Sequence, residues 1–364
     1  MGGPRRGRVV TGVPGALMRG GTSKGLVALA ADLPADPAGR DDLLLRLLGS
    51  PDPREIDGLG GAHPLTSKVA LVGPSPDDAA DVDYLFLQVV PDEPVVSTSQ
   101  TCGNMLAAVA PFAVLRGLVP AGEDRTVVRV RLVNTGAVAA LTVRTPGGRV
   151  TFDGDTAISG VPGTAAPVEV ALAASSARLL PTGAVRDRVD GLDVTLLDAG
   201  MPSVLVRAED LGLRGDEPPA ELEGDDVLVA RVARIRAEAF GLMGLAGTPG
   251  TTTTPKVVLL SAPGDDGAVR TRSFIPYRVH EAIGVLGAAS VAAAVRVAGS
   301  VAADVAKVPA PDAAVRVEHP TGYLDLHVDL ADAVPGEPPA VREVRMLRTA
   351  RLLMDGTVFP RPRT

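Results

Sequence analysis

The chain has 364 residues, which at roughly 150 residues per domain leaves room for about two packed units. Hydrophobic residues make up 46% of it, and because there is no Trp and only 6 Phe, the core must be built from Val, Leu and Ala. The net charge of -7 and the scarcity of aromatic side chains argue against a nucleic-acid partner.

A single cysteine excludes an internal disulfide and a Cys-rich zinc site, and it fits a reducing compartment. The four histidines show no metal-ligand spacing, so we expect no metal. No apolar run has the length of a signal peptide core or of a membrane span. We therefore expect a cytoplasmic protein with no membrane partner.

The first half of the chain alternates strand and helix patterns. A short amphipathic helix is predicted at 40–48, followed by strands at 66–72 and 82–90. The segment 102–118 is apolar over most of a helical circumference, which predicts a buried helix, and Pro111 within it predicts a kink or break. From 125 to 170, β-branched runs separated by turn sequences predict an antiparallel sheet. This half is strands around one buried helix.

The second half repeats that order. The strand sequence TPKVVLL at 254–260 mirrors TSKVALV at 66–72, so that Lys256 corresponds to Lys68. A strand at 269–276 and a second apolar helix at 286–300 follow; this helix opens on Gly287 as the first opens on Gly103. The other predictions are a strand at 198–206, a polar amphipathic helix at 221–242 that covers the lobe or contacts a second subunit, and at 341–358 a strand followed by a short helix.

The repeat predicts an α+β protein of two pseudo-twofold-related lobes, each with β-structure around a central buried helix. We expect residues 1–186 to form the N-terminal lobe, which carries Lys68 and Cys102 and is joined by the tail 340–364. Residues 187–339 form the C-terminal lobe. The sequence leaves open whether the protein forms a homodimer.

Lysine is rare in this chain. Of 36 Lys and Arg residues only four are lysines, at positions 24, 68, 256 and 307. An amine can lose its proton when desolvated and a guanidinium cannot, so a lysine kept in an arginine-rich chain is a candidate acid/base group. We expect that role for Lys68. Lys256 is expected to be a structural echo of the repeat, and Lys24 either contacts an anion or caps its turn.

The two helix starts can bind anions. A helix N-terminus has unpaired N–H groups and a partial positive charge, so two such ends facing each other would clamp a small polycarboxylate. Cys102 lies at the first start, where the thiolate form is favoured, whereas the second start offers Leu286. Epimerases that use two thiols need one cysteine from each half. The single cysteine instead favours proton transfer between two carbons of an allylic acid. We expect Lys68 to remove the proton and either Lys68 or Cys102 to return it.

Seven segments along the chain resemble the 2-methylaconitate isomerase (PrpF) family, whose fold is diaminopimelate-epimerase-like. The resemblance covers nearly the whole chain. The segments are MRGGTSKG (18–25), IDGLGGAHPLTSKVALV (56–72), DVDYLF (81–86), TCGNMLAAV (101–109), NTG (134–136), GVPGTAAPV (160–168) and EHPTGYLDL (318–326).

The resemblance implies a cofactor-independent isomerase or tautomerase that moves a proton and a double bond in a small unsaturated di- or tricarboxylic acid of the 4-oxalomesaconate type. It implies acid/base roles for Lys68 and Cys102. It further implies substrate contacts from the loop at 21–23 and the helix starts, at Gly21, Thr22, Ser23, Gly103, Asn104, Met105, Gly287 and Ala288, and a place in the same cleft for Met201. We also expect substrate contacts from Arg19, Ser67 and Arg272; Arg272 alternates along its strand, so it is either solvated or faces the cleft.

Three alternatives stay open: an aconitate or 2-methylaconitate cis-trans isomerase, a 3-methylitaconate delta-isomerase, and a carboxylate-binding protein without catalysis. Two departures from the family pattern bear on the substrate. Leu286 stands where the family has Thr, and Thr101 where it has Asn, which favours a smaller or less oxidised acid or one with an apolar substituent near Leu286. His280 is either a substrate contact or a structural histidine.

Overall fold

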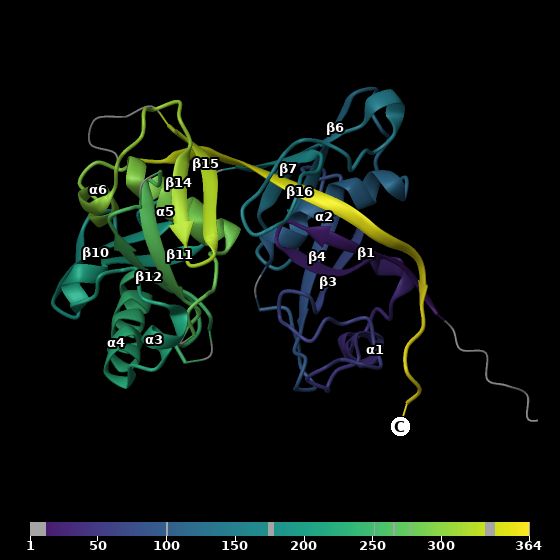
Figure 1. Ribbon diagram of the computed structural model, residues 1–364, viewed down its shortest axis with the longest axis horizontal. Coiled ribbons are helices and arrows are strands. Elements are labelled where there is room, and N and C mark those ends of the chain that lie inside the picture. The colour runs from purple at the N-terminus through teal and green to yellow at the C-terminus, as the bar shows by residue number, and fades with distance from the viewer. Residues whose placement is uncertain are drawn as a thin grey trace, which may run out of the picture.

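The computed structural model describes residues 12–99, 101–173, 178–250, 252–264, 266–276, 278–331 and 339–363. Figure 1 shows two lobes side by side, connected by the long strand β16 (Val341–Val358). Residues 341–346 of this strand pair with the second lobe, and residues 343–358 pair with the first. In the described part of the chain, no helix combines the length and the apolar character needed to cross a membrane.

The first lobe is a twisted sheet that closes on itself, because β16 pairs both with β8 and with β1. Its long strands are β1 (Val13–Gly20), β2 (Ser23–Leu29), β3 (Lys68–Pro74), β4 (Val82–Val89), β6 (Arg125–Leu132), β7 (Val138–Arg144) and β8 (Pro167–Ala173), and the short β5 (Val96–Ser97) pairs with β4. The helices are α1 (Pro37–Leu48) and α2 (Gly103–Leu115), and the 3-10 turns are η1 (Ala30–Asp32) and η2 (Pro146–Gly148).

The second lobe continues the same sheet from β16 through β15 to β9. Its strands are β9 (Asp187–Val189), β10 (Leu192–Asp198), β11 (Pro202–Arg207), β12 (Lys256–Ser261), β13 (Val269–Phe274), β14 (Val315–His319) and β15 (Gly322–Leu330). Its helices are α3 (Pro219–Glu223), α4 (Asp226–Leu242), α5 (Val285–Arg296) and α6 (Val301–Val305), with the 3-10 turn η3 (Ala208–Leu211).

The pairing pattern confirms the expected pseudo-twofold repeat. In the first lobe β2 is parallel to β3, β3 antiparallel to β4, and β4 parallel to β6. The second lobe repeats this with β11, β12, β13 and β14. Helix α2 connects β4 to β6, and α5 follows β13 in the same position before β14. Lys68 and Lys256 each begin the second strand of their set.

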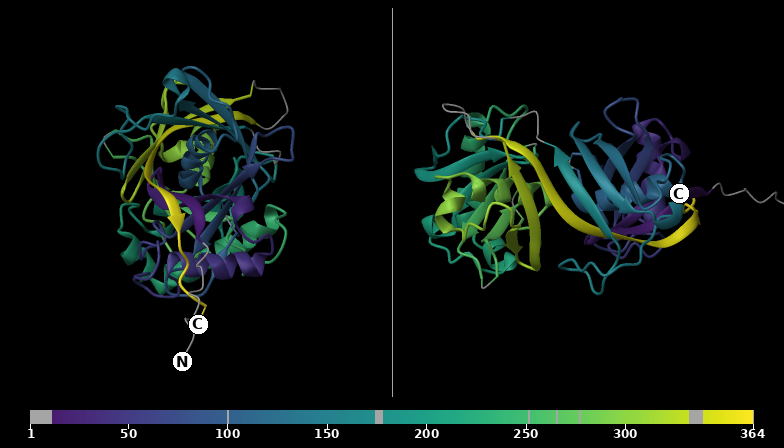
Figure 2. Two further views of the ribbon diagram at one scale, coloured as in Figure 1. Left: turned by 90° about the vertical axis from the view of Figure 1, so that its right-hand side faces the viewer. Right: turned by 90° about the horizontal axis from the view of Figure 1, so that it is seen from above.

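Helices α2 and α5 form the centre of the lobes. Every residue of α5 except its last is buried, as are the nine residues of α2 from Met105 to Ala113. Both pack into one continuous apolar cluster built largely from Val, Leu and Ala, as the composition predicted. Figure 2 shows α2 enclosed by strands of the first lobe. Burial on all sides explains why their sequences lack a polar face.

Four predictions about elements were wrong. The tail 341–358 is one strand without a helix, because pairing with β15, β8 and β1 overrides its helix-favouring Leu, Met and Arg content. Helix α2 continues through Pro111, so the alternative of a break at this residue is wrong. The helix expected at 286–300 ends at Arg296, and α6 follows. The helix expected at 221–242 is divided into α3 and α4 at Gly224, and α4 packs its apolar side on the second lobe.

Candidate active site

The first turns of α2 and α5 meet between the lobes. A Cβ atom placed at Gly103 would lie 2.5 Å from the Cβ of Val285. In α2, the residues 103–105 have no intrahelical acceptor for their N–H groups. Helix α5 begins at Val285, earlier than expected, and the Ala288 N–H donates to the Gly284 carbonyl at 2.8 Å. The free donors of α5 are therefore those of residues 285–287, Gly287 included.

Lys68 begins β3 with its side chain 6% exposed. Its Nζ donates to the Gln88 Oε1 at 2.6 Å and lies 5.2 Å from the centroid of the Phe86 ring. It forms no ion pair with any described carboxylate. The amine is thus buried but held only by a neutral amide and a ring face.

Cys102 is the N-cap residue of α2 and is partly exposed. Its carbonyl accepts a hydrogen bond from the Leu106 N–H at 3.0 Å, which begins the helix, and another from the Tyr84 hydroxyl at 3.0 Å. Burial raises the pKa of Tyr84 well above its usual value, so this hydroxyl stays a donor. The thiol is therefore held at the helix start, as the sequence predicted.

The loop at 21–23 is fastened to the start of α2 by Asn104. The Asn104 Nδ2 donates to the Thr22 Oγ1 at 3.0 Å, and its Oδ1 accepts from the Arg348 Nη2 at 3.0 Å. Gly21 adopts a φ of +52°, and a Cβ there would lie 2.3 Å from the Asn104 Oδ1, so only glycine allows this approach. The Ser23 Oγ is buried with no partner.

Arg348 on β16 is a site residue that the sequence analysis missed. It is 3% exposed, its Nε has no partner, and it forms no ion pair among the described residues. Burial lowers the pKa of Arg348 to about 10, so the guanidinium keeps its charge at neutral pH. No local signal distinguishes it from the other arginines, because only the pairing of β16 brings it to Asn104.

The second lobe contributes Lys256 and His280. Lys256 is 6% exposed, and burial together with the charge of Arg236 lowers its pKa to about 8. Burial, followed by the charges of Lys68 and Lys256, lowers the pKa of His280 to about 4. The lysines of both lobes thus act on one imidazole, which is neutral at pH 7. Its Nδ1 accepts from the Ala282 N–H at 2.9 Å, which leaves the proton on Nε2.

His319 and Arg272 lie on the paired strands β14 and β13 of the second lobe. Burial, then the charges of Arg348, His280 and Arg272, lowers the pKa of His319 to about 4. The Arg272 guanidinium donates to the carbonyls of Glu217 at 2.6 Å and Thr271 at 2.9 Å. The charges of Glu217, Asp216 and Glu318 act on Arg272, so this guanidinium has acidic neighbours.

Several predicted contacts have structural partners in this arrangement. The Arg19 Nη1 donates to the carbonyls of Gly21 and Thr349, which ties the loop to β16. Ser67 is fully buried, and its hydroxyl donates to Glu55. The Met201 carbonyl accepts from the Ser290 hydroxyl at 2.9 Å, so it anchors its turn to α5. Met105 is fully buried in the core.

The charge of the site is the opposite of that of the whole chain. Among the residues that the structure describes, Lys68, Lys256 and Arg348 have no carboxylate ion-pair partner, although the chain carries a net charge of -7. Burying three such cations without counter-ions is costly unless an anion joins them. The site therefore suits a small molecule with several carboxylates. The described residues hold no cluster of three or more His, Cys, Asp or Glu that could bind a metal ion.

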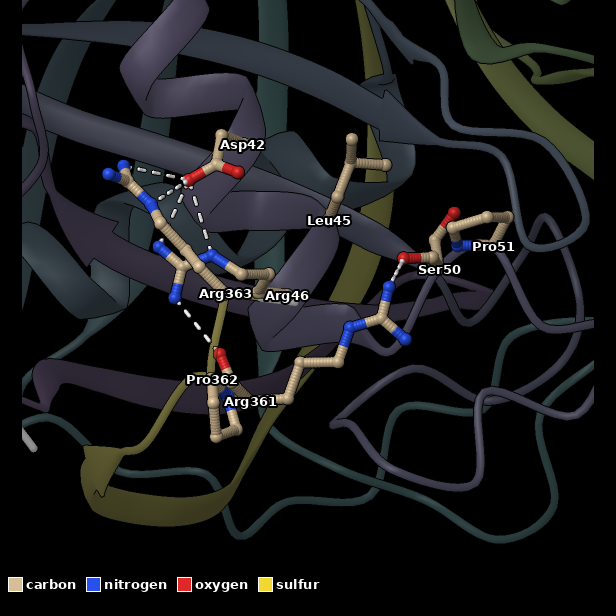
Figure 3. Close-up of a pocket in the computed structure, with 8 residues that line it drawn as sticks. All are labelled: Asp42, Leu45, Arg46, Ser50, Pro51, Arg361, Pro362 and Arg363. Atoms are coloured by element: carbon tan, nitrogen blue, oxygen red, sulfur yellow. Dashed lines mark hydrogen bonds and ion pairs between the residues drawn. The ribbon is translucent and has the colours of Figure 1, made fainter.

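A separate cavity of about 250 Å³ lies between α1 and the C-terminal segment. Figure 3 shows that its charged groups already have partners. Asp42 pairs with Arg46 and Arg363, and Arg361 donates to the Ser50 carbonyl at 2.5 Å. None of the site residues above lines it.

The fold and the cationic site between the lobes define the class: an isomerase with the diaminopimelate-epimerase-like fold. The chain belongs to the PrpF family, described as "PrpF protein", which matches residues 10–361. It is 51% identical over 361 residues to the (4E)-oxalomesaconate Delta-isomerase of Novosphingobium sp. (strain KA1), covering 98% of this chain and 99% of that protein.

Two further comparisons agree. The 4-oxalomesaconate tautomerase of Pseudomonas putida (strain KT2440) is 50% identical over 353 residues, covering 96% of each chain. A crystal structure of methylitaconate-delta-isomerase superposes with a TM-score of 0.81 at 33% identity, covering 97% of this chain and 96% of that one. These relatives confirm the predicted family, fold class and isomerase activity.

Proposed function

We propose that the protein isomerises a small unsaturated tricarboxylic acid of the 4-oxalomesaconate type by a 1,3-allylic proton transfer that needs no cofactor. The observation that carries this proposal is the set of buried cations without carboxylate partners, which come from both lobes: Arg348 contacts Asn104 at the start of α2, and the charges of Lys68 and Lys256 both act on His280. Relatives at about half identity are named for oxalomesaconate, which supports this substrate over the other acids of the family.

In the proposed reaction Lys68 is the base that removes a proton from the carbon next to the double bond. The negative charge spreads over a dienolate that ends on a carboxylate or oxo oxygen. The free N–H groups of residues 103–105 and 285–287 then stabilise that oxygen as a preorganised anion site. Cys102 returns a proton to the far carbon, and the double bond has moved by one position.

The remaining groups hold the carboxylates. Arg348 remains charged at neutral pH, and Lys256 offers a cation from the second lobe. His280 is neutral and presents its Nε2–H as a hydrogen-bond donor. Because these groups come from both lobes, the acid would bridge the lobes when it binds.

Leu286 favours a second candidate, a less oxidised acid such as 2-methylaconitate or 3-methylitaconate. It is 7% exposed and lies against the turn at Gly200, where a Cβ would be 3.3 Å from the Leu286 Cδ2. An apolar side chain in the first turn of α5 would accept a methyl group more readily than a carboxylate.

The test is proton exchange in deuterated water, followed by NMR, with 4-oxalomesaconate, 2-methylaconitate, 3-methylitaconate and cis-aconitate. We expect deuterium incorporation together with movement of the double bond, fastest for 4-oxalomesaconate. A higher kcat/KM for a methyl-substituted acid would select the second candidate. Binding without label incorporation for any of the four acids would show a carboxylate-binding protein instead.

A further inference from the structure

Gln88 lies directly across from Lys68 in the register of β3 and β4 and is 9% exposed. Its side-chain Nε2 lies 3.1 Å from each of the carbonyl oxygens of Pro64, Ser67 and Val89, to which it donates. These contacts fix which way the amide faces. The Gln88 Oε1 is thereby aimed at the Lys68 Nζ, 2.6 Å away.

The two lobes provide an internal comparison. Lys256 begins β12 as Lys68 begins β3, and both side chains are 6% exposed. In the described structure no hydrogen-bond acceptor contacts the Lys256 Nζ. The pairing of β12 with β13 places Phe274 across from Val257, so the next position across the strands is Ile275, which has no acceptor in its side chain. Gln88 thus gives Lys68 a hydrogen-bond acceptor that its counterpart lacks.

We propose that Gln88 is a positioning residue that holds the Lys68 Nζ for proton transfer while leaving it free to change its charge; this rests on the proposed function. A neutral amide oxygen can accept a hydrogen bond from an ammonium or from an amine, and it favours the ammonium far less than a carboxylate does. A carboxylate at the same place would stabilise the ammonium and keep the base protonated. The amide therefore orients the amine and leaves its lone pair available.

The test compares the near-isosteric Gln88→Glu with Gln88→Met, which lacks the acceptor, over the full pH range of kcat and KM. For Gln88→Glu we expect the acidic limb of the kcat/KM profile to move to higher pH. For each pH unit by which the limb moves, kcat/KM at pH values below the limb falls about tenfold. At alkaline pH, kcat/KM returns to its plateau. For Gln88→Met we expect kcat on the plateau to fall about 10²-fold with little change in KM. If Gln88 had only a structural role, both substitutions would lower kcat/KM by the same factor at every pH.

A second readout does not depend on turnover. With four lysines in the chain, protein labelled with [13Cε]lysine gives few signals, and Lys68→Met assigns that of Lys68. We expect this signal to titrate at higher pH in Gln88→Glu than in the wild type, with unchanged thermal unfolding. Equal midpoints, or a wild-type kcat in Gln88→Met, would overturn the proposal. Failure of the wild type to isomerise any acid would refute the proposed function instead, while the titration would still report on the contact.

Discussion

Gly103 and Val285 touch across the two lobes: a Cβ on Gly103 would stand 2.5 Å from the Val285 Cβ and 2.9 Å from its Cγ1. Each is the first residue of its helix. Two helix N-termini can approach this closely because one of them carries no side chain. The proposed anion site therefore depends on a glycine for steric reasons, with no requirement for a special backbone angle.

Gly103→Ala should separate the two helix starts. Overpacking of this kind costs ~1–3 kcal/mol of unfolding free energy, and a displacement near 1 Å lowers kcat/KM by about 10²-fold. Adding Val285→Gly should restore most of the activity because it removes the clashing atoms. Gly241→Ala in α4 is the matched control, since a Cβ there meets nothing within 4 Å. Chemical denaturation and steady-state kinetics measure both effects, and an active Gly103→Ala single variant would show that the lobes do not need this contact.

Lys68→Met should abolish isomerisation and also deuterium exchange, with a loss of about 10²–10⁴-fold or more, while the circular dichroism spectrum stays that of the wild type. Methionine matches the length of the chain but has no base. Substantial residual exchange would rule out Lys68 as the base.

Cys102→Ser should separate the two halves of the reaction. Because Lys68 is intact, proton removal and exchange at the first carbon should continue, while return of a proton to the far carbon slows by about 10²–10⁴-fold. NMR in deuterated water measures the two positions independently. Undiminished isomerisation would mean that Lys68 also returns the proton.

Lys256→Met should raise KM more than it lowers kcat, because a carboxylate-binding cation is removed from the second lobe. It should also change the pH dependence of stability. The folded-state pKa is about 8 and the ordinary value 10.5, so between these pH values the unfolded chain binds more protons and wild-type stability rises with pH. The variant should lack this rise of roughly 3 kcal/mol. Urea denaturation at pH 7.5 and 10.5 measures this change in unfolding free energy. The same change in the variant and in the wild type would contradict a desolvated ammonium at Lys256.

Wild-type stability should fall as pH decreases from 6.5 to 4, partly because of His280. Its folded-state pKa of about 4 lies below the ordinary 6.5, so the unfolded chain gains the proton first. His280→Asn keeps an acceptor for the Ala282 N–H and should reduce the acid loss by up to about 3 kcal/mol. His63→Asn, in an exposed loop, is the control. If His280→Asn lost as much unfolding free energy as the wild type between pH 6.5 and 4, His280 would not be desolvated.

Local sequence was sufficient for the elements that carry Lys68 and Cys102. The repeat placed Lys68 and Lys256 at equivalent strand starts, and the apolar runs beginning near Cys102 and Leu286 identified the two buried helices, as the structure confirms. These features were readable because hydrophobic periodicity and turn residues act over a few residues. The same reading misjudged β16, whose strand form depends on partners more than 150 residues away in the chain.

What the sequence by itself determined is the pair of lobes, the lone thiol at a helix start and the scarcity of amines. Only the tertiary structure decided which side chains lie next to the helix start and next to Lys68. Arg348 reaches Asn104 because β16 pairs with β8, and Gln88 faces Lys68 because of the β3–β4 register. The charges of Lys68 and Lys256, one from each lobe, both lower the pKa of His280. Long-range pairing fixes these contacts, and no periodicity within one segment encodes them.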